Sequence, residues 1–497
     1  MDHVIGIDIG TTAVKVIIAG GNAAAARAGS EYGLLLPKPG WVEQDADLMW
    51  QAVRSALNKA LAQFKGDRRG IRAISLSTQR DTLVCVDREN RPVRNMITWM
   101  DGRSTAQCEK LSAGIGDEKV YGITGVGIST IWTLAFILWI RDHEKDVFSR
   151  TACFGLVHDH VMMRLGAKKH YLDRSSACQT MLYDLFQGVW SFELMEYAGL
   201  DAERLPDLVD PGTFIGTLDP SLAAEFGLGK EVALIAGGGD QQCAALGAGA
   251  VMPGEVEIGI GTAGNILAVT DVPVLDPHRR MICHRSVVPN GWILEGAMLA
   301  TGKVIQWIQD TIYSGKSLPE IDREIAEKSL PGAGGMVMVP HFEGAACPYW
   351  NPQATGVVFG LTLSSGKADI ARAAMEGICL ETRKNVDLLP QFGITASRVL
   401  VSGGAARSAV WMQILADVLG LDVHIPVESD CAALGAALLA AFGCSVMTQE
   451  EAFSGGIAVD AVYHPDAKLH GLYESLYRKN CDLYQTINSA GLYGGGA

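Results

Sequence analysis

The pattern of apolar and polar positions predicts short buried strands that alternate with amphipathic helices. Near the N-terminus, the apolar runs HVIGIDIG and AVKVIIAG are joined by Gly-Thr-Thr, a pattern typical of a β-hairpin. Apolar residues then recur at helical spacing in DADLMWQAVRSALNKALAQF, with Asp45 or Asp47 as the predicted N-cap. The continuous apolar runs IRAISLS and EVALIAGGG predict further strands that are buried on both faces.

The N-terminal pattern occurs a second time near the middle of the chain. GEVEIGIGTAGNILAVT, residues 254–270, repeats the strand, Gly-Thr turn and strand of VIGIDIGTTAVKVIIA. A single repeat at about half the chain length indicates two related halves rather than a solenoid. We place the boundary in the glycine-rich GAGAVMPGE and predict domains at residues 1–247 and 248–444. Residues 445–497 carry aromatics at helical spacing and predict a helical tail packed on these domains.

Composition and charge fit a cytoplasmic protein with two sizeable cores. Of 497 residues, 48% are hydrophobic and 19% charged. The net charge of −14 argues against nucleic acid or an anionic membrane as the main partner, because both require a cationic surface. Eleven cysteines without CxxC spacing indicate reduced thiols, and MDHVIGIDIG lacks a signal-peptide pattern. The apolar run at residues 131–140 is about half as long as a membrane-spanning helix and predicts a buried helix. The oligomeric state stays open, with a homodimer as one option.

The two Gly-Thr turns are candidate phosphate sites. A turn of this kind presents backbone N–H groups and hydroxyls to an anion. The residues that would do so are Gly10, Thr11 and Thr12 in the first turn, and Gly261, Thr262 and Gly264 in the second. Lys15 would neutralise charge on a transferring phosphoryl group, and Asp8 would hold Mg²⁺ through water. One such turn is an ordinary hairpin, whereas two matching turns in two similar halves predict a nucleotide that bridges the halves.

Four segments together resemble the FGGY family of carbohydrate kinases, in the order and spacing of that family. GIDIGTTAVK resembles its first phosphate loop, IGIGTAG its second, SGGAARSAVWMQILADVLG its adenosine loop, and GGGDQQCAALG the segment that holds the general base. The resemblance implies an α/β protein of two RNase H-like, actin-like ATPase domains with the active site in the cleft between them. It also implies ATP and Mg²⁺ as cofactors.

The resemblance also implies roles for single residues. Asp240 would be the general base that deprotonates a substrate hydroxyl, and it would lie beside the metal. Gly261 and Thr262 would contact the outer phosphates, together with Thr11, Thr12 and Lys15 of the first loop. The nucleotide channel and the adenosine site would be lined by Gly302, Gln306, Gly404, Ala405 and Ser408. At Gly403 and Gly404, a base can lie flat on the backbone because no Cβ intervenes.

The substrate side is similar to two branches of the family. Gln79, Arg80 and Asp81 resemble the NQRE-type segment with which glycerol kinases grip their polyol, and Trp99 and Asp101 resemble the WxDxR segment shared with xylulokinases. An arginine beside a carboxylate offers fixed donors and acceptors to vicinal hydroxyls. Gln241, next to the general base, would contact the substrate as well. The sequence therefore predicts an ATP-dependent kinase that acts on a hydroxyl of a small polyol or ketose.

Three departures keep the exact substrate open. Ile131, next to Trp132, stands where glycerol kinases carry an aromatic that closes over glycerol. TQRD replaces the QMHG segment of xylulokinases. In HFEGAACPYWNP, the residues Ala345, Ala346 and Cys347 replace polar ones, so we expect no catalytic role there.

Other readings of the chain are a chaperone-like or actin-like ATPase and a phosphohydrolase of the same superfamily, in which ATP turnover would not depend on added sugar. We expect structural roles for His158 and His160 of HDH, which lack an evident third metal ligand. Asp173 and Ser175 are likewise interpreted as structural.

Overall fold

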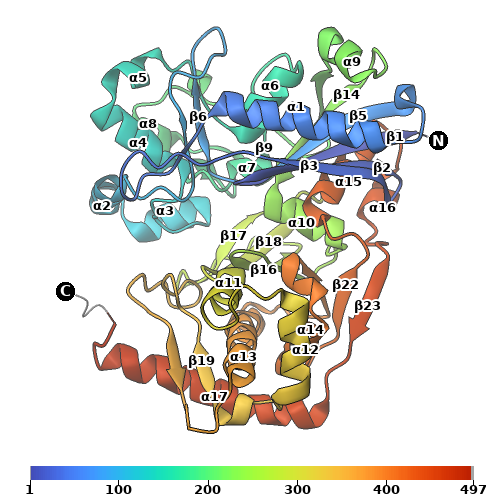
Figure 1. Ribbon diagram of the computed structural model, residues 1–497. Coiled ribbons are helices and arrows are strands. Elements are labelled where there is room, and N and C mark those ends of the chain that lie inside the picture. Colours follow the sequence, from blue (N-terminus) through green and yellow to red (C-terminus); the bar gives the residue numbers. More distant parts are fainter. Residues whose placement is uncertain (1, 494–497) are drawn as a thin grey trace.

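The computed structural model describes residues 2–493, which form two α/β domains, one above the other in Figure 1. The first domain is built on a six-stranded sheet in the order β13-β14-β5-β1-β2-β3. β1, β5 and β14 are parallel to one another, whereas β2, β3 and β13 are antiparallel to their neighbours. These strands are β1 (His3–Ile9), β2 (Ala13–Gly20), β3 (Ala23–Glu31), β5 (Ile71–Thr78), β13 (Phe214–Thr217) and β14 (Ala233–Gly239).

The predicted N-terminal hairpin and the helix after it are confirmed. β1 and β2 pair with Ile9 opposite Val14, so the turn falls on the Gly-Thr-Thr segment. The helix α1 (Ala46–Gln63) begins after Asp45, whose carboxylate accepts hydrogen bonds from the N–H groups of Asp47 and Leu48. Asp45, rather than Asp47, is therefore the N-cap.

The second domain repeats this arrangement, as the sequence predicts. Its seven-stranded sheet has the order β17-β18-β16-β15-β21-β22-β23. β15 forms a hairpin with β16 and pairs in parallel with β21, just as β1 pairs with β2 and β5. The strands are β15 (Glu255–Ile260), β16 (Gly264–Thr270), β17 (Ile282–Arg285), β18 (Trp292–Met298), β21 (Arg398–Ser402), β22 (Val423–Pro426) and β23 (Val459–Tyr463). The helices of this domain are α11 (Gly302–Thr311), α12 (Leu318–Lys328), α13 (Lys367–Val386), α14 (Ala409–Leu419) and α17 (Ala467–Ser489).

A smaller four-stranded sheet and a group of helices extend the first domain (Figure 1). The sheet contains β4 (Glu43–Gln44), β7 (Met96–Ile97), β6 (Leu83–Val86) and β8 (Cys153–Leu156). The helices are α2 (Thr105–Gly114), α3 (Asp117–Thr124), α4 (Thr133–His143), α5 (Lys145–Arg150), α6 (Val157–Leu165), α7 (Arg174–Ala177), α8 (Phe192–Ala198) and α9 (Pro220–Phe226). The apolar run predicted as a buried helix lies in α4, where residues 133–140 are all buried. Among the described residues, none of the helices combines the length and the apolar character needed to cross a bilayer.

Two helices rich in small residues join the domains. α10 (Asp240–Ala248) packs against α15 (Cys431–Gly443), and α15 in turn lies on the sheet of the first domain. The approach is so close that a Cβ at Gly435 would stand 1.9 Å from the carbonyl oxygen of Cys243. A Cβ at Gly247 would meet the carbonyl oxygen of Cys431 at the same distance. Glycine is required at both positions because the neighbouring atoms belong to the backbone and cannot rotate away.

Gly435→Ala is therefore expected to lower the free energy of unfolding by about 1–3 kcal/mol, the usual range for overpacking a closely packed core. The matched control is Gly471→Ala in α17, because a Cβ at Gly471 has open space around it. That control is expected to be neutral or to stabilise by up to about 1 kcal/mol through helix propensity. Denaturant and thermal midpoints of the two variants check this prediction. Equal midpoints would show that the helix contact has no influence on stability.

The C-terminal segment differs in part from the predicted helical tail. Besides α16 (Gln449–Phe453) and α17, it contains β23, the edge strand of the second sheet, which pairs with β22. Residues of β23 alternate between exposed and half-buried, so this short strand gives a weak apolar pattern. The tail is thus partly a component of the second domain. All eleven cysteines lie in the described residues, are unpaired and are buried or half-buried, in agreement with the prediction of reduced thiols.

Candidate active site

The two Gly-Thr turns adopt the same tight geometry in the two domains. The N–H of Gly10 donates to the carbonyl of Ala13 at 3.0 Å, and the N–H of Gly261 donates to the carbonyl of Ala263 at 3.0 Å. Both turns leave a threonine exposed, Thr12 in the first and Thr262 in the second. The matching geometry supports the prediction of two equivalent anion-binding turns.

Side chains from several elements hold the first turn in place. The indole Nε1 of Trp99 donates to Oγ1 of Thr11 at 3.1 Å. The hydroxyl of Tyr32 donates to the carbonyl of Gly10, and Nε2 of Gln79 donates to Oε1 of Gln44 at 2.9 Å. Gln79 is buried, and its Nε2 also donates to the Tyr32 hydroxyl at 3.3 Å, so its amide nitrogen supports the turn, while its Oε1 has no hydrogen-bond partner.

The second turn lies against the start of α11. The N–H of Gly302 donates to the carbonyl of Gly261 at 2.9 Å, and the hydroxyl of Thr301 donates to the same oxygen at 2.9 Å. A Cβ at Gly302 would stand 2.4 Å from that oxygen, so this close approach requires glycine. The N-terminus of α11 therefore lies next to exposed Gly261 and Thr262, where its dipole favours negative charge.

Asp240 is the first residue of α10, directly after β14, and it faces a cation from the same domain. Its Oδ1 accepts the N–H of Gln241 at 2.9 Å and lies 3.5 Å from Nε of Arg80. Burial raises the pKa of the Asp240 carboxyl, although the charge of Arg80 works in the opposite direction. About a quarter of the side chain stays exposed, at 28%, so a ligand can reach the carboxylate.

Arg80 connects the two domains through a buried acid that the sequence reasoning missed. Its guanidinium forms a fork with Glu295 of β18, with N–O distances of 2.8 and 2.9 Å. His284 of β17 lies 2.6 Å from the same carboxylate, and burial disfavours the charge of Glu295 while Arg80 lowers its pKa strongly. The signal in the sequence was an isolated acid inside the apolar strand WILEGAM.

Asp81 has an unusual backbone and an unsatisfied carboxylate. Its φ angle is 63°, in the left-handed region that non-glycine residues rarely adopt. The residue is buried, its Oδ1 has no hydrogen-bond partner, and burial raises its pKa well above the usual value. Strain and unmet hydrogen-bonding capacity at one residue are typical of a functional position.

Asp8 and Lys15 are cross-strand partners in the β1–β2 hairpin. The hydroxyl of Ser77 donates to Asp8 at 2.8 Å, and burial together with the charge of Asp240 raises the pKa of Asp8 to about 7. The ammonium of Lys15 lies 2.8 Å from Asp430 of the second domain. Mutual repulsion of Asp8 and Asp240 is the feature that a divalent cation would relieve.

The comparisons with known proteins decide between the classes of function that this geometry allows. A model of the N-terminal domain of the FGGY family of carbohydrate kinases matches residues 3–247, and a model of its C-terminal domain matches residues 257–444. The chain belongs to the FGGY family of carbohydrate kinases. This kinase is 30% identical over 486 residues to the xylulose kinase of Staphylococcus epidermidis, covering 97% of this chain and 96% of that one. It is 32% identical over 479 residues to the glycerol kinase of Rhizobium meliloti, covering 93% of this chain and 94% of that one.

A solved structure agrees with the family match over the whole chain. The crystal structure of the xylulose kinase from Rhodospirillum rubrum aligns with a TM-score of 0.89 at 28% identity, covering 98% of this kinase and 99% of that chain. The fold is thus the expected pair of actin-like ATPase domains, and the protein is a phosphotransferase with an alcohol group as acceptor. The family implies ATP as its phosphoryl donor.

The predicted nucleotide residues of this kinase differ in their access to a ligand. Gly404 is exposed, with open space where a Cβ would be, so a base can approach its backbone. Ala405 is buried in the core of the second domain, and Ser408 is completely buried with its hydroxyl accepting the N–H of Trp411. Ser408 therefore caps α14, and its hydroxyl is engaged there rather than free for a ribose. Gln306 is exposed on α11 and donates to Asp310 at 2.9 Å.

The predicted substrate residues Trp99 and Asp101 lie in one loop but have different surroundings. Trp99 is 36% exposed, whereas Asp101 is buried and its carboxylate binds Arg103 through both oxygens. The N–H of Val42 donates to Asp101 as well. With these partners, Asp101 positions the Trp99 loop and has no free oxygen directed to a substrate.

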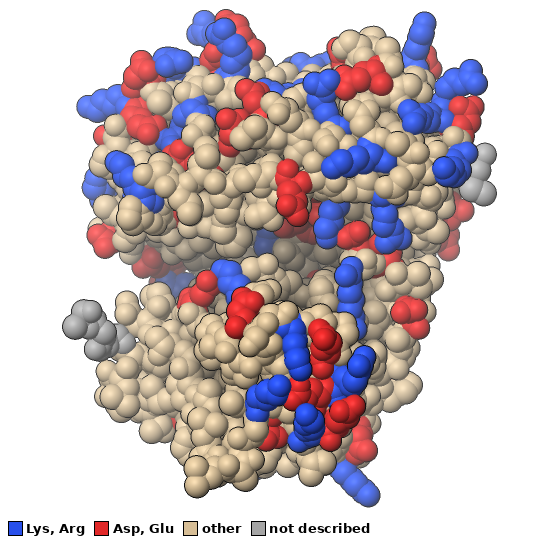
Figure 2. Space-filling view, in the orientation of Figure 1, with Lys and Arg blue, Asp and Glu red and all other residues tan. Residues whose placement is uncertain are grey.

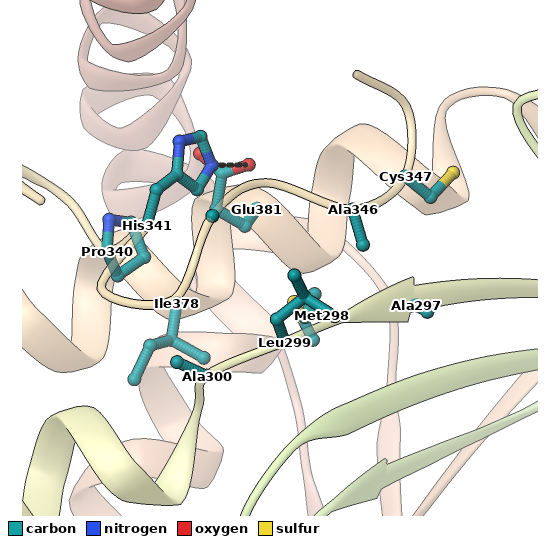
Figure 3. A pocket seen from close by; sticks show the side chains of 11 residues that line it. Ala297, Met298, Leu299, Ala300, Pro340, His341, Ala346, Cys347, Ile378 and Glu381 are labelled. Carbon is teal, nitrogen blue, oxygen red and sulfur yellow. Dashed lines mark ion pairs between the residues drawn. The ribbon is translucent and has the colours of Figure 1, made fainter. Parts of the chain in front are cut away.

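Between the domains, the space-filling view shows a hollow with both basic and acidic side chains at its rim (Figure 2). The loop at residues 340–350 borders a cavity of about 20 Å³, roughly the room for one water (Figure 3). Ala346 and Cys347 line that cavity, and the ion pair between His341 and Glu381 closes one side. Burial opposes the charge of Glu381, yet Lys384 and His341 lower its pKa to about 2. His341 and Glu381 are both buried, so this ion pair is part of the core of the second domain.

The residues interpreted as structural support the strand that ends at Asp240. His158 accepts the N–H of Gly237 at 3.0 Å, and the hydroxyl of Ser175 accepts the N–H of Gly239 at 3.2 Å. Ser175 also donates to Asp173. These contacts hold the end of β14 in place, and so determine the position of Asp240, which follows this strand directly.

Proposed function

We propose that this kinase transfers the γ-phosphoryl group of ATP to a hydroxyl of a small neutral polyol or ketose, with Asp240 as the general base. The observation that carries the proposal is the placement of Asp240, a partly exposed carboxylate of raised pKa at the junction of the domains. A carboxylate in such a position accepts the hydroxyl proton more readily than an ordinary aspartate, because burial makes it more basic.

The first domain would hold the sugar and the second the nucleotide. Residues 1–247 contribute Arg80, Asp81 and Trp99, whereas residues 248–444 contribute the second turn, the N-terminus of α11 and the open backbone at Gly404. Phosphoryl transfer depends mainly on positioning and on neutralising charge, and these elements offer N–H groups and a helix dipole for that purpose. Closure of the domains would exclude water, so that the sugar hydroxyl attacks.

Mg²⁺ would lie next to Asp8 and Asp240. Burial, and in addition the charge of Asp240, raises the pKa of Asp8, and oxygen ligands of this kind suit a hard cation. When bound, the ion would neutralise charge on the phosphates. Thr11, Thr12 and Lys15 would contact the phosphates from the first turn, and the exposed Lys15 would exchange its half-buried partner Asp430 for them.

The charges of the site favour a neutral substrate over a sugar acid. Three carboxylates, of Asp81, Asp240 and Glu295, lie near Arg80, which already pairs with Glu295. A substrate carboxylate would add a further negative charge, and one like-charge contact at about 4 Å costs roughly 4 kcal/mol at an effective dielectric constant of 20. The names of the relatives, xylulose kinase and glycerol kinase, fit a neutral substrate.

An assay of ADP release across acceptors tests this proposal. The panel contains glycerol, tetritols, pentitols, ketopentoses and deoxy-ketohexoses, with aldonic acids of matched length as comparators. We expect kcat/KM for the best neutral acceptor to exceed that of its matched acid by about 10² or more. An acid as the best substrate would contradict the charge argument, and full turnover without acceptor would contradict the kinase assignment.

A further inference from the structure

A second groove between the domains is lined by residues that the reaction does not use. It has a volume of about 630 Å³, within the range of small-molecule sites. The first domain contributes Arg174, Gln187 and Thr213, and the second contributes Arg285, Ser286 and Asn290. α7 and β17, which carry the two arginines, contact one another at the level where the domains meet (Figure 1).

Arg285 is a half-buried cation without an acidic partner. Its guanidinium stacks on the ring of Trp292, with Cζ 3.9 Å from the ring centroid. Its Nε is buried without a hydrogen-bond partner, and within residues 2–493 no carboxylate forms an ion pair with it. Stacking fixes the plane of the guanidinium, so its N–H groups are held ready for an anion.

Arg174 supplies a second guanidinium to the same groove, and its existing partner is weak. Its Nη1 lies 2.9 Å from Asp210, whose side chain is 77% exposed. Such a solvent-exposed ion pair contributes little free energy and is readily exchanged for a stronger anion. Asp210 is the one acid among the lining residues, so the groove has two positive charges against one negative charge in a chain of net charge −14.

The groove is separated from the catalytic residues by one strand. His284 and Arg285 are consecutive in β17, and consecutive side chains of a strand point to opposite faces. His284 contacts Glu295, the partner of Arg80, on one face. Arg285 lines the groove on the other face.

We propose that this groove binds a phosphate group, carried by a small phosphorylated metabolite, between the guanidinium groups of Arg174 and Arg285. Two guanidiniums on opposite walls suit the several oxygens of a phosphate monoester, and the hydroxyls and amides of the lining suit a sugar or polyol attached to it. Because the walls belong to different domains, the bound anion bridges the domains at a place distinct from the nucleotide and sugar sites.

Calorimetric titration of the full-length protein, with saturating MgADP to occupy the nucleotide site, tests the proposal. The probes are glucose 6-phosphate, inorganic phosphate and, as the uncharged control, glucose. We expect glucose 6-phosphate to bind and Arg285→Gln to weaken that binding at least tenfold. Asp210→Asn, at an exposed position that does not endanger folding, is expected to tighten binding several-fold because it frees Arg174.

The matched charge control is Arg69→Gln, since Arg69 is 82% exposed and pairs with Asp67 away from the groove. It is expected to bind glucose 6-phosphate like the unchanged protein. If inorganic phosphate binds more weakly than glucose 6-phosphate, the ligand is a phosphorylated metabolite. If the two bind equally, the ligand is free phosphate at the same two arginines. Absence of phosphate binding, or binding that neither Arg285→Gln nor Asp210→Asn alters, would overturn the proposal.

Discussion

Asp240→Asn is expected to lower the rate of phosphoryl transfer by roughly 10² or more while ATP binding stays nearly unchanged. The amide keeps the size of the side chain but cannot accept the hydroxyl proton. Direct nucleotide contacts are assigned to the two turns and to the second domain, and Asp8 remains beside the proposed Mg²⁺, so this substitution removes no side chain that contacts the nucleotide itself. Steady-state kinetics and calorimetric titration with a non-hydrolysable ATP analogue measure the two quantities separately. Near-normal turnover would show that Asp240 is not the base.

The pH dependence of the same variant gives an independent check. A base acts only when it is deprotonated, so kcat/KM falls as the pH drops through the pKa of the group. Burial raises the pKa of Asp240, and burial together with Asp240 raises that of Asp8 to about 7. Removing the charge at position 240 lowers the pKa of Asp8. The residual kcat/KM of the variant is therefore expected to fall off at a lower pH than that of the unchanged protein. The exposed substitution Asp67→Asn serves as the control, with an unshifted profile.

Arg80→Ala is expected to raise the KM for the sugar far more than the KM for ATP and to destabilise the fold. The sugar loses a guanidinium held next to the general base. In addition, Glu295 becomes a buried carboxylate without its main partner, and breaking a buried ion pair on one side costs about 3–5 kcal/mol. Kinetics against each substrate and the unfolding midpoint together measure these two effects.

The double variant Arg80→Ala, Glu295→Gln separates stability from substrate binding. Glutamine at position 295 removes the buried charge that has lost its partner. We therefore expect the unfolding midpoint to recover in large part while the KM for the sugar stays high. Recovery of the sugar KM along with stability would mean that Arg80 acts only by holding Glu295. Equal increases of both KM values in Arg80→Ala would also contradict its assigned role.

Much of the fold could be predicted because its strongest local signals agree with its long-range contacts. The hairpin around Gly10 and its repeat around Gly261 each combine apolar runs with a Gly-Thr turn, and both are present as predicted. β23 was missed since its half-exposed residues carry little apolar periodicity and it is stabilised by pairing with β22. Pairing partners far apart in sequence leave no mark on the local pattern.

In the site, too, residues within motifs could be predicted, whereas contacts between distant residues could not. Asp240 and Arg80 could be chosen from motifs, and the structure brings them within 3.5 Å. Glu295 lies 215 residues from Arg80, and its burial against that arginine becomes visible only when the domains are placed together. Asp101 and Ser408 were chosen as ligand contacts, but their polar atoms are engaged by Arg103 and by the N–H of Trp411. Residue type alone cannot distinguish a polar group that is free from one that is already satisfied.

The measurement that tests the central claim most directly is ³¹P NMR of the protein with MgATP, first alone and then with the preferred neutral polyol or ketose. Transfer to a sugar hydroxyl predicts that ATP persists in the absence of acceptor. With acceptor, a phosphate monoester is expected to accumulate in step with ADP. Inorganic phosphate released at the same rate with and without acceptor, and no monoester, would contradict the account.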